Sequence, residues 1–291
     1  MSDAVRARVA AELEELSAPG HELHSESPRS TWVTYGDTVA RLRTWEELIE
    51  EFTSLQEGIT TDGRIAIVTA GPPGSGKSTT TTAILEAGDN PTSYRRIDPD
   101  VIKDLLLDRA IKDGLYEPLL QKRLSDGLPI MPRELSGLVH EESTRLAREI
   151  RRRCMRKGEN VVVEGTLSWP DMIDVHLREL TEAGYDALHV VSVEVPKAVA
   201  AERVMDRWWA GRNDLADSLG GRFVPIAVID GCWDEDGDPS RCDLNARELF
   251  RRARRQEGLV VTLTTSQDDL GEANQPGTDI RDRALRAMES D

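Results

Sequence analysis

The chain has 291 residues, 38% of them hydrophobic, and a formal net charge of −16 at pH 7. This length suits one large α/β domain, or one such domain with a small appendage. The longest apolar runs, such as residues 161–163, are far shorter than the roughly 20 residues of a membrane helix, and the first twenty residues carry too many acids for a signal peptide. The composition therefore favours a globular protein and excludes an integral membrane protein.

The net charge and the cysteines indicate in which compartment the protein works and which partners it binds. A net charge of −16 opposes binding to a polyanion, although a local basic groove could still form, so it argues against nucleic-acid substrates. The cysteines at 154, 232 and 242 lack metal-ligand spacing and fit a reducing compartment, with pairing of Cys232 and Cys242 only under oxidising conditions. We expect a cytoplasmic protein.

The first 60 residues are expected to form a helical extension. Residues 3–17 carry apolar side chains at helical spacing. Residues 21–36 are polar and irregular, and a second helix is predicted over 44–55, with Thr44 as the N-cap of a capping box.

Short, β-branched, almost continuously apolar segments follow, separated by helical ones. The predicted strands are 64–70, 94–98, 160–166, 187–195 and 259–265. Such strands suit a parallel sheet that is covered on both faces. Helices are expected over 140–157 and 197–209. The alternation predicts an α/β fold of the P-loop kinase-like type, a doubly wound parallel sheet of about five strands with helices on both faces.

The strongest motif is GPPGSGKST, which lies between the first strand and a helix. Its glycines allow several backbone N–H groups to approach one phosphate at a helix N-terminus. Lys77 would reach the β- and γ-phosphates, and the Ser78 hydroxyl would bind Mg²⁺. The predicted ATP-binding residues are Gly71, Pro72, Pro73, Gly74, Ser75, Gly76, Lys77, Ser78 and Thr79.

Two absences narrow the class of nucleotide-binding protein. No apolar run ends in the Asp-Glu pair of ATP-driven motors, and no guanine-reading motif follows. The motif pattern therefore favours a small-molecule kinase over a motor or a GTPase.

Acidic and polar residues follow the second and third predicted strands. Asp98 and Asp100 lie in RRIDPD, and VVVEGT ends in Glu164 and Thr166. The carboxyl ends of parallel strands share one edge of a sheet, where ligands bind. Asp100 is our candidate for the carboxylate that orients an acceptor hydroxyl and takes its proton. Asp98, Glu164 and Thr166 are candidates for binding the acceptor, with strand-end capping as the alternative.

Arginines follow the fourth predicted strand. Arg203 and Arg207 lie four residues apart on one helical face, and Arg212 and Arg222 follow in a glycine-rich, less regular segment. Arginines of a mobile lid commonly stabilise the transferred phosphoryl group. His140, at the start of a helix, is a further candidate for substrate binding, with a structural role as the alternative.

Five segments, in this order, resemble the zeta-toxin family: GPPGSGKST, IDPD, RKGENVVVEGT, VSVEVPKAVAAERVMDRW and GGRFVP. The resemblance covers roughly residues 60–230. It implies a P-loop kinase fold, the use of ATP and an antitoxin protein as a candidate partner. The best-known members of the family are bacterial toxins that phosphorylate the 3′-hydroxyl of UDP-N-acetylglucosamine.

By motif, the resemblance assigns the phosphate-binding lysine to Lys77 and the catalytic aspartate to Asp100. It assigns the strand-end Glu-Gly-Thr to residues 164–166 and the two lid arginines to Arg207 and Arg222. The catalytic candidates are thus Asp100, Lys77, Arg207 and Arg222.

Two departures from the family pattern leave the acceptor open. The toxins' substrate-binding glutamate corresponds by spacing to Arg148, with Glu149 one residue away, and residues 113–136 differ from the toxins' substrate region.

We therefore predict a kinase that uses ATP and Mg²⁺ to phosphorylate a hydroxyl of a small molecule, with UDP-N-acetylglucosamine or a related nucleotide sugar as the first candidate. The alternatives are a nucleoside, dinucleotide or antibiotic hydroxyl and, from another class, a nucleotide-dependent binding protein without turnover. The expected organisation is a helical extension over 1–60, a kinase core over 61–268 with a lid around 197–225, and a C-terminal tail or helix over 269–291. The extension would either pad the sheet or shield the nucleotide site.

Overall fold

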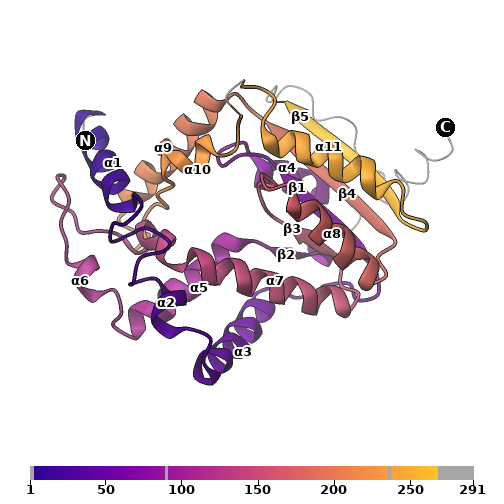
Figure 1. Ribbon diagram of the computed structural model, residues 1–291, viewed down its shortest axis with the longest axis horizontal. Helices are drawn as coiled ribbons and strands as arrows, with labels where there is room; N and C mark the ends of the chain where they lie inside the picture. Colours follow the sequence, from indigo (N-terminus) through magenta and orange to yellow (C-terminus); the bar gives the residue numbers. More distant parts are fainter. Residues whose placement is uncertain (1–2, 89–90, 235–236, 268–291) are drawn as a thin grey trace. The chain divides into compact units, whose positions relative to one another are not determined.

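The computed structural model describes residues 3–88, 91–234 and 237–267 (Figure 1). The chain divides into two compact units, each built from separate stretches of sequence. Unit 1 comprises residues 1–55, 99–148 and 202–228, and unit 2 comprises residues 56–98, 149–201 and 229–291. The predicted C-terminal tail or helix over 269–291 lies outside the described residues.

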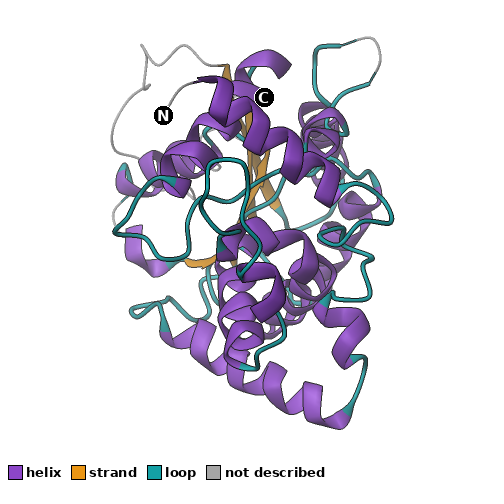
Figure 2. Ribbon diagram, turned by 90° about the vertical axis from the view of Figure 1, so that its left-hand side faces the viewer, coloured by secondary structure: helices purple, strands orange, loops and turns teal. Residues whose placement is uncertain are grey.

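Unit 2 contains a five-stranded parallel sheet in the order β2-β3-β1-β4-β5. The strands are β1 (Ile65–Ala70), β2 (Arg95–Ile97), β3 (Val161–Val163), β4 (Ala187–Glu194) and β5 (Val260–Gln267). In Figure 2 the sheet is seen almost edge-on, as a narrow orange band. All five predicted strands are present, and the predicted doubly wound parallel sheet is confirmed.

Helices pack on both faces of this sheet, as the side chains of β4 show. Val191 and Val193 face α4 (Lys77–Glu86) and form a buried cluster with Leu85. Ser192, which points to the other face because side chains alternate along a strand, donates a 2.8 Å hydrogen bond to Asp243 of α11 (Arg241–Ala253). Figure 1 shows α11 running along β4 and β5, and α8 (Asp171–Glu182) packs beside it.

The described part of unit 1 is helical. Its elements are α1 (Asp3–Ser17), α2 (Thr31–Tyr35), α3 (Val39–Ser54), α5 (Pro99–Lys112), α6 (Glu117–Leu120) and the 3₁₀ helix η2 (Pro132–Val139). Three helices contain residues of both units: α7 (His140–Arg156), α9 (Lys197–Arg212) and α10 (Ile226–Asp230). A short 3₁₀ helix, η1 (Pro91–Ser93), precedes β2 in unit 2. Within the described ranges, no helix is long and apolar enough to cross a bilayer.

The N-terminal helices differ in detail from the prediction. The segment 21–36, expected to be irregular, contains α2 with Ser30 as its N-cap. The second predicted helix begins at Val39, because the Thr38 hydroxyl accepts the 3.2 Å hydrogen bond from the Arg41 backbone N–H that caps it. Thr44 therefore lies inside α3, and its hydroxyl donates to the carbonyl of Ala40.

A buried ion pair joins α3 to the part of α7 that belongs to unit 1. Arg41 donates two hydrogen bonds to the carboxylate of Glu142, at 2.5 and 2.7 Å, and the Trp45 indole donates a third at 2.8 Å. The Arg41 side chain is 5% exposed and the Glu142 side chain is fully buried. A buried charge requires such partners, so this contact ties the start of the chain to the rest of unit 1.

The sequence placed Arg212 in an irregular segment. In the structure it is the last residue of α9 and belongs to a second buried network. Its guanidinium donates to Asp126 at 2.8 Å and to Glu134 at 2.7 Å. All three side chains are fully buried. Trp208 of the same helix also donates to Glu134 at 2.8 Å. Arg212 therefore stabilises unit 1 and is unavailable as a lid arginine.

We expect His176 of α8 to make the stability of the protein depend on pH. The side chain is 6% exposed, and burial together with the charge of Arg151 lowers its pKa from the ordinary 6.5 to about 3. Between these values the unfolded chain binds a proton that the folded protein does not, so stability should fall as the pH falls from 6.5 towards 3. The loss should be about 1.4 kcal/mol for each pH unit.

Replacing His176 by the neutral isostere glutamine should remove this part of the acid sensitivity. Urea unfolding at several pH values between 4 and 7 measures it, with the exposed His21→Gln variant as the control. Parallel stability–pH curves for His176→Gln and His21→Gln would contradict the expectation.

Candidate active site

The phosphate-binding motif forms the turn between β1 and α4. Gly74 and Gly76 have φ angles of 83° and 91°, in the left-handed region that glycine adopts most easily. A Cβ at Gly71 would lie 2.4 Å from the carbonyl oxygen of Val193, so only glycine fits there. Because β1 lies between β3 and β4, the turn occupies the switch point of the sheet, where ligands bind in folds of this kind.

The turn has the features of a phosphate cradle. Nζ of Lys77 donates to the carbonyl oxygens of Gly71 and Pro72, at 2.8 and 2.9 Å, which keeps the ammonium group over the loop. The buried hydroxyl of Ser75 has no hydrogen-bond partner among the described residues. A Cβ at Gly76 would meet no atom within 4 Å, so the backbone is open there. The cation, the unpartnered donor and the open helix N-terminus together fit a nucleotide phosphate.

Glu164, directly after β3, connects the phosphate loop to β2. Its carboxylate accepts a 3.0 Å hydrogen bond from the hydroxyl of Ser78 and two more, at 3.0 and 2.5 Å, from the guanidinium of Arg96. Glu164 is 8% exposed. Glu164 thereby orients the Ser78 hydroxyl, which we expect to bind a metal ion. Glu164 therefore lies on the ATP side of the predicted site.

The segment after Glu164 is bonded to the end of β1. The Thr69 hydroxyl accepts from the N–H of Gly165 at 3.1 Å, and the N–H of Gly71 donates to the carbonyl of Thr166 at 3.0 Å. The Thr166 hydroxyl lies 3.0 Å from the hydroxyl of Ser168. The predicted substrate residue Thr166 therefore lies beside the phosphate loop.

In unit 1 the structure brings together the catalytic candidates Asp100, Arg207 and Arg222. The surrounding protein would raise the pKa of the Asp100 carboxyl group, whose side chain is 46% exposed. The positive charges of Lys103 and Arg222 outweigh this effect and hold that pKa below its usual range, with a smaller contribution from Arg207. Asp100 is therefore ionised at neutral pH.

Arg222 is held by polar groups of α5 and η2. It pairs with the Asp100 carboxylate at 3.4 Å and donates to Asp104 at 2.6 Å and to the Ser136 hydroxyl at 2.5 Å. Asp104 also accepts from Arg133, at 3.0 to 3.2 Å, so it lies between two arginines. This network fixes the guanidinium of Arg222 next to the candidate base.

The glycines before Arg222 have a packing role. Gly220 and Gly221 belong to the glycine-rich segment in which the sequence predicts a mobile lid. A Cβ at Gly221 would lie only 1.9 Å from the carbonyl oxygen of Trp208, a residue of the buried core. The absence of a side chain at Gly221 is therefore required for close contact between the segment that carries Arg222 and α9.

Of the remaining site candidates, His140 belongs to the surroundings of Asp100. Desolvation by the surrounding protein and the charge of Lys103 lower the pKa of its imidazole, while the charges of Glu141 and Asp100 act in the opposite direction. Asp98 follows β2 in unit 2 and is half-buried. His140 is the exposed first residue of α7, and its carbonyl accepts from the hydroxyls of Ser143 and Thr144.

Arg96, Asp104 and Ser136 were not predicted from the sequence. A charged residue inside a short buried strand such as β2 needs a partner, and this signal could have drawn attention to Arg96. No group of three or more His, Cys, Asp or Glu residues within the described ranges could hold a metal ion. Mg²⁺ usually takes few protein ligands beside substrate phosphates, and Ser78 remains the predicted protein ligand.

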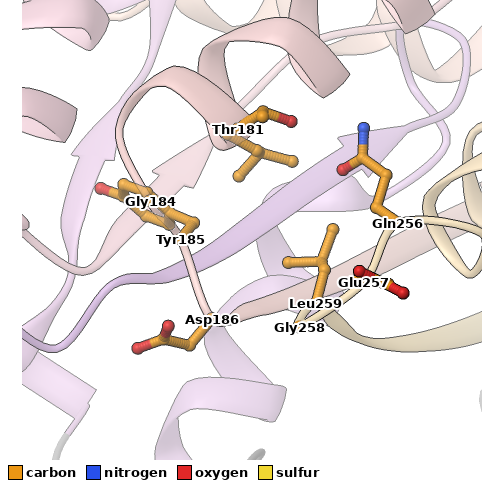
Figure 3. Close-up of a pocket in the computed structure, with 9 residues that line it drawn as sticks. Thr181, Gly184, Tyr185, Asp186, Gln256, Glu257, Gly258 and Leu259 are labelled. Carbon is orange, nitrogen blue, oxygen red and sulfur yellow. The ribbon is translucent and has the colours of Figure 1, made fainter.

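A cavity of about 480 Å³ lies in unit 2. Figure 3 shows the residues that line it. Thr181, Tyr185 and Asp186 line one side, and Gln256, Glu257 and Leu259 line the other. These residues precede β4 and β5, so the cavity lies at the amino edge of the sheet, opposite the edge that carries the phosphate loop. It is separate from the candidate active site.

We expect the Arg96→Met variant to be less stable than the wild type by about 2 kcal/mol, because Glu164 would keep a mostly buried charge without its cation. The double variant Arg96→Met/Glu164→Gln should recover much of the loss. Urea unfolding measures both, with Arg152→Met, on the exposed surface of α7, as the control. Equal losses for the single and double variants would show that Arg96 does not act through Glu164.

We expect the Arg222→Met variant to raise the pKa of Asp100 towards its usual range, and Arg207→Met to do so by less. Carbon NMR of the side-chain carboxyl groups during a pH titration measures the change. Arg133→Met, which removes a partner of Asp104, serves as the control. An unchanged Asp100 pKa in Arg222→Met would show that the arginine does not set it.

A family model described as "Zeta toxin" matches residues 53–238, well over half of the chain. The curated proteins contain no match.

Three solved structures share the fold at low identity. A structure of the PezAT chromosomal toxin–antitoxin system of Streptococcus pneumoniae is 14% identical, with a TM-score of 0.51, and the match covers 87% of this chain and 94% of that one. A structure of AvrRxo1-ORF1:AvrRxo1-ORF2 with sulphate ions is 17% identical, with a TM-score of 0.51, over 86% of this chain and 69% of that one. A structure of AvrRxo1-ORF1:-ORF2 with ATP is also 17% identical, with a TM-score of 0.51, over 78% and 63% of the two chains. These matches agree with the predicted P-loop kinase-like fold and with the five-stranded parallel sheet of the structure.

Proposed function

Because the chain belongs to the zeta toxin family, we propose that it is a kinase that uses ATP and Mg²⁺ to phosphorylate a hydroxyl group of a small molecule. The observation that carries the proposal is the phosphate loop with Lys77 over it and with the Ser78 hydroxyl held by Glu164. One of the structures with this fold is described as containing ATP, which supports the choice of donor.

The proposal assigns the donor to unit 2. The backbone N–H groups of the loop and the ammonium group of Lys77 hold the phosphates of ATP. The Ser78 hydroxyl, oriented by Glu164, provides the ligand for Mg²⁺. The ion, when bound, neutralises charge on the phosphoryl oxygens.

The proposal assigns the acceptor hydroxyl to Asp100. A new bond forms from the acceptor oxygen to the γ-phosphorus as the bond from that phosphorus to the leaving oxygen of ADP breaks, and the proton of the hydroxyl passes to Asp100. Its lowered pKa keeps the carboxylate free to accept a hydrogen bond from the hydroxyl at neutral pH. Orientation matters more than base strength here, because the transition state of phosphoryl transfer is loose.

Arg207 and Arg222 would stabilise the transferred phosphoryl group, as part of a lid around residues 197–225. Arg222 now pairs with Asp100 and Asp104. We propose that its charge is shared with the phosphoryl oxygens during transfer, which would also release Asp100 to bind the acceptor.

The acceptor that we favour is UDP-N-acetylglucosamine or a related nucleotide sugar, by analogy with the family's toxins. Asp98, His140, Glu164 and Thr166 remain our candidates for holding it. The descriptions of the similar structures, which name a toxin–antitoxin system and a complex of two chains, support an antitoxin protein as a partner. A nucleotide-binding protein without turnover is the alternative, and the arginines around Asp100 argue against it.

We expect the Asp100→Asn variant to bind ATP as the wild type does and to lose phosphotransfer by about 100-fold or more, because general base catalysis contributes factors of this size. The matched control is Asp108→Asn, on the exposed surface of the same helix, where Asp108 pairs with Lys112. The assay supplies labelled ATP with UDP-N-acetylglucosamine, or with a metabolite extract, and identifies the labelled product by mass spectrometry. Wild-type activity in Asp100→Asn would reject Asp100 as the base, and ATP binding without any product would favour the binding protein.

A further inference from the structure

The loop between β3 and α8 is tied closely to the phosphate loop. Gly165 is bonded to Thr69, and the Thr166 carbonyl accepts from the N–H of Gly71. These contacts continue the pairing of β3 with β1 beyond the ends of the strands. The side chains that this loop exposes to solvent therefore lie beside the proposed phosphate site of unit 2.

Leu167 fixes the course of this loop. Its φ angle is 54°, in the left-handed region that residues other than glycine rarely adopt. The side chain is 5% exposed, and the carbonyl accepts a 2.8 Å hydrogen bond from the buried side-chain amide of Asn245 in α11. Such a conformation persists only where the surrounding structure holds it, and strained positions of this kind cluster at functional sites.

Trp169 is the side chain that this rigid loop exposes. It is 74% exposed, whereas Trp208 and Trp233 are 0% and 4% exposed. Its backbone carbonyl accepts from the N–H of Met172 in α8, and Pro170 restricts its backbone conformation. A single exposed apolar residue would by itself need no explanation. The Trp169 indole, however, is exposed on a loop that hydrogen bonds hold beside the proposed phosphate site. An exposed aromatic ring in a fixed position can stack on a ring of a ligand.

We propose that Trp169 stacks on a planar aromatic ring of the acceptor, so that the acceptor carries a nucleobase or a ring of similar shape. The proposal rests on the proposed function and adds the residue that would bind the base of the favoured nucleotide-sugar acceptor. The ring is assigned to the acceptor because β3 lies between β1 and β2. The loop after β3 therefore lies on the β2 side of the phosphate loop, where Asp98 also follows its strand, and away from β4 and β5.

The nearby hydroxyls would complete this subsite. Thr166 and Ser168 lie 3.0 Å apart and are both half-buried. A pair of hydroxyl groups can donate to and accept from the polar edge of a base while the indole covers its face. Stacking alone tolerates every base, so these hydroxyls would add what selectivity the subsite has.

The test uses tryptophan fluorescence of the full chain saturated with a non-hydrolysable ATP analogue. The probes are UDP-N-acetylglucosamine, UMP and, as a base-free control, ribose 5-phosphate. We expect the two base-containing probes to change the emission of the wild type, ribose 5-phosphate to leave it unchanged, and Trp169→Phe to abolish the change. Trp169→Ala should weaken binding of the base-containing probes about 10-fold, and Trp169→Phe should keep most of the affinity.

The controls separate the possible failures. Leu244→Ala removes another exposed apolar side chain of unit 2 and should behave as the wild type. Weaker binding of the ATP analogue to Trp169→Ala, with unchanged binding of the probes, would place the adenine of ATP on Trp169 and overturn the proposal. Phosphorylation of a ring-free acceptor with equal kinetics in the wild type and Trp169→Ala would also overturn it while supporting the kinase. Probe binding that depends on Trp169, without phosphotransfer to any acceptor, would support the subsite and reject the proposed function.

Discussion

The parallel pairing of β1 with β3 is the contact on which the candidate site of unit 2 depends. It sets Ala66 to Val68 in register with Val161 to Val163, and β1 continues for two residues beyond this pairing, to Ala70. The phosphate loop and the segment from Glu164 to Thr166 then leave the sheet side by side, close enough for Gly71 to donate to Thr166 and Ser78 to Glu164. A register shift of one residue would reverse the direction of these side chains and separate the groups.

The second constraint is electrostatic, because this acidic chain places its site arginines among carboxylates. Arg96 neutralises the mostly buried Glu164, and Arg222 lies against Asp100 and Asp104. Such pairs keep both partners ionised and oriented, which pre-organises a site at the cost of desolvation. If Arg222 binds the transferred phosphoryl group, as we propose, an anionic substrate would compete with these carboxylates for it. Its entry would weaken the pairing that now lowers the pKa of Asp100, so binding of phosphate and basicity of Asp100 are coupled.

The sequence predicted the sheet and the phosphate loop well because both follow from local patterns. Continuous β-branched runs mark buried parallel strands, and a glycine-rich turn before a helix has few other uses. The sequence predicted poorly the roles of side chains whose contacts lie far away along the chain. Arg212 belongs to a buried network with Asp126 and Glu134, which no local spacing reveals. The start of α3 was misplaced because Thr44 and Glu47 have the pattern of a capping box, whereas the helix in the structure is capped by Thr38 without a box.

The same distinction explains why the acceptor is harder to read from the sequence than the donor. Phosphate is bound largely by backbone N–H groups, so its site has a signature of glycines at fixed spacing that survives at low identity. An acceptor is recognised by side chains on loops, whose positions follow from tertiary contacts. Leu167 shows this: its buried side chain and its bond to Asn245 place the next exposed residue, Trp169, beside the phosphate loop. Since nothing in the packing of unit 2 requires an indole at that position, the choice of side chain there is free to follow the acceptor.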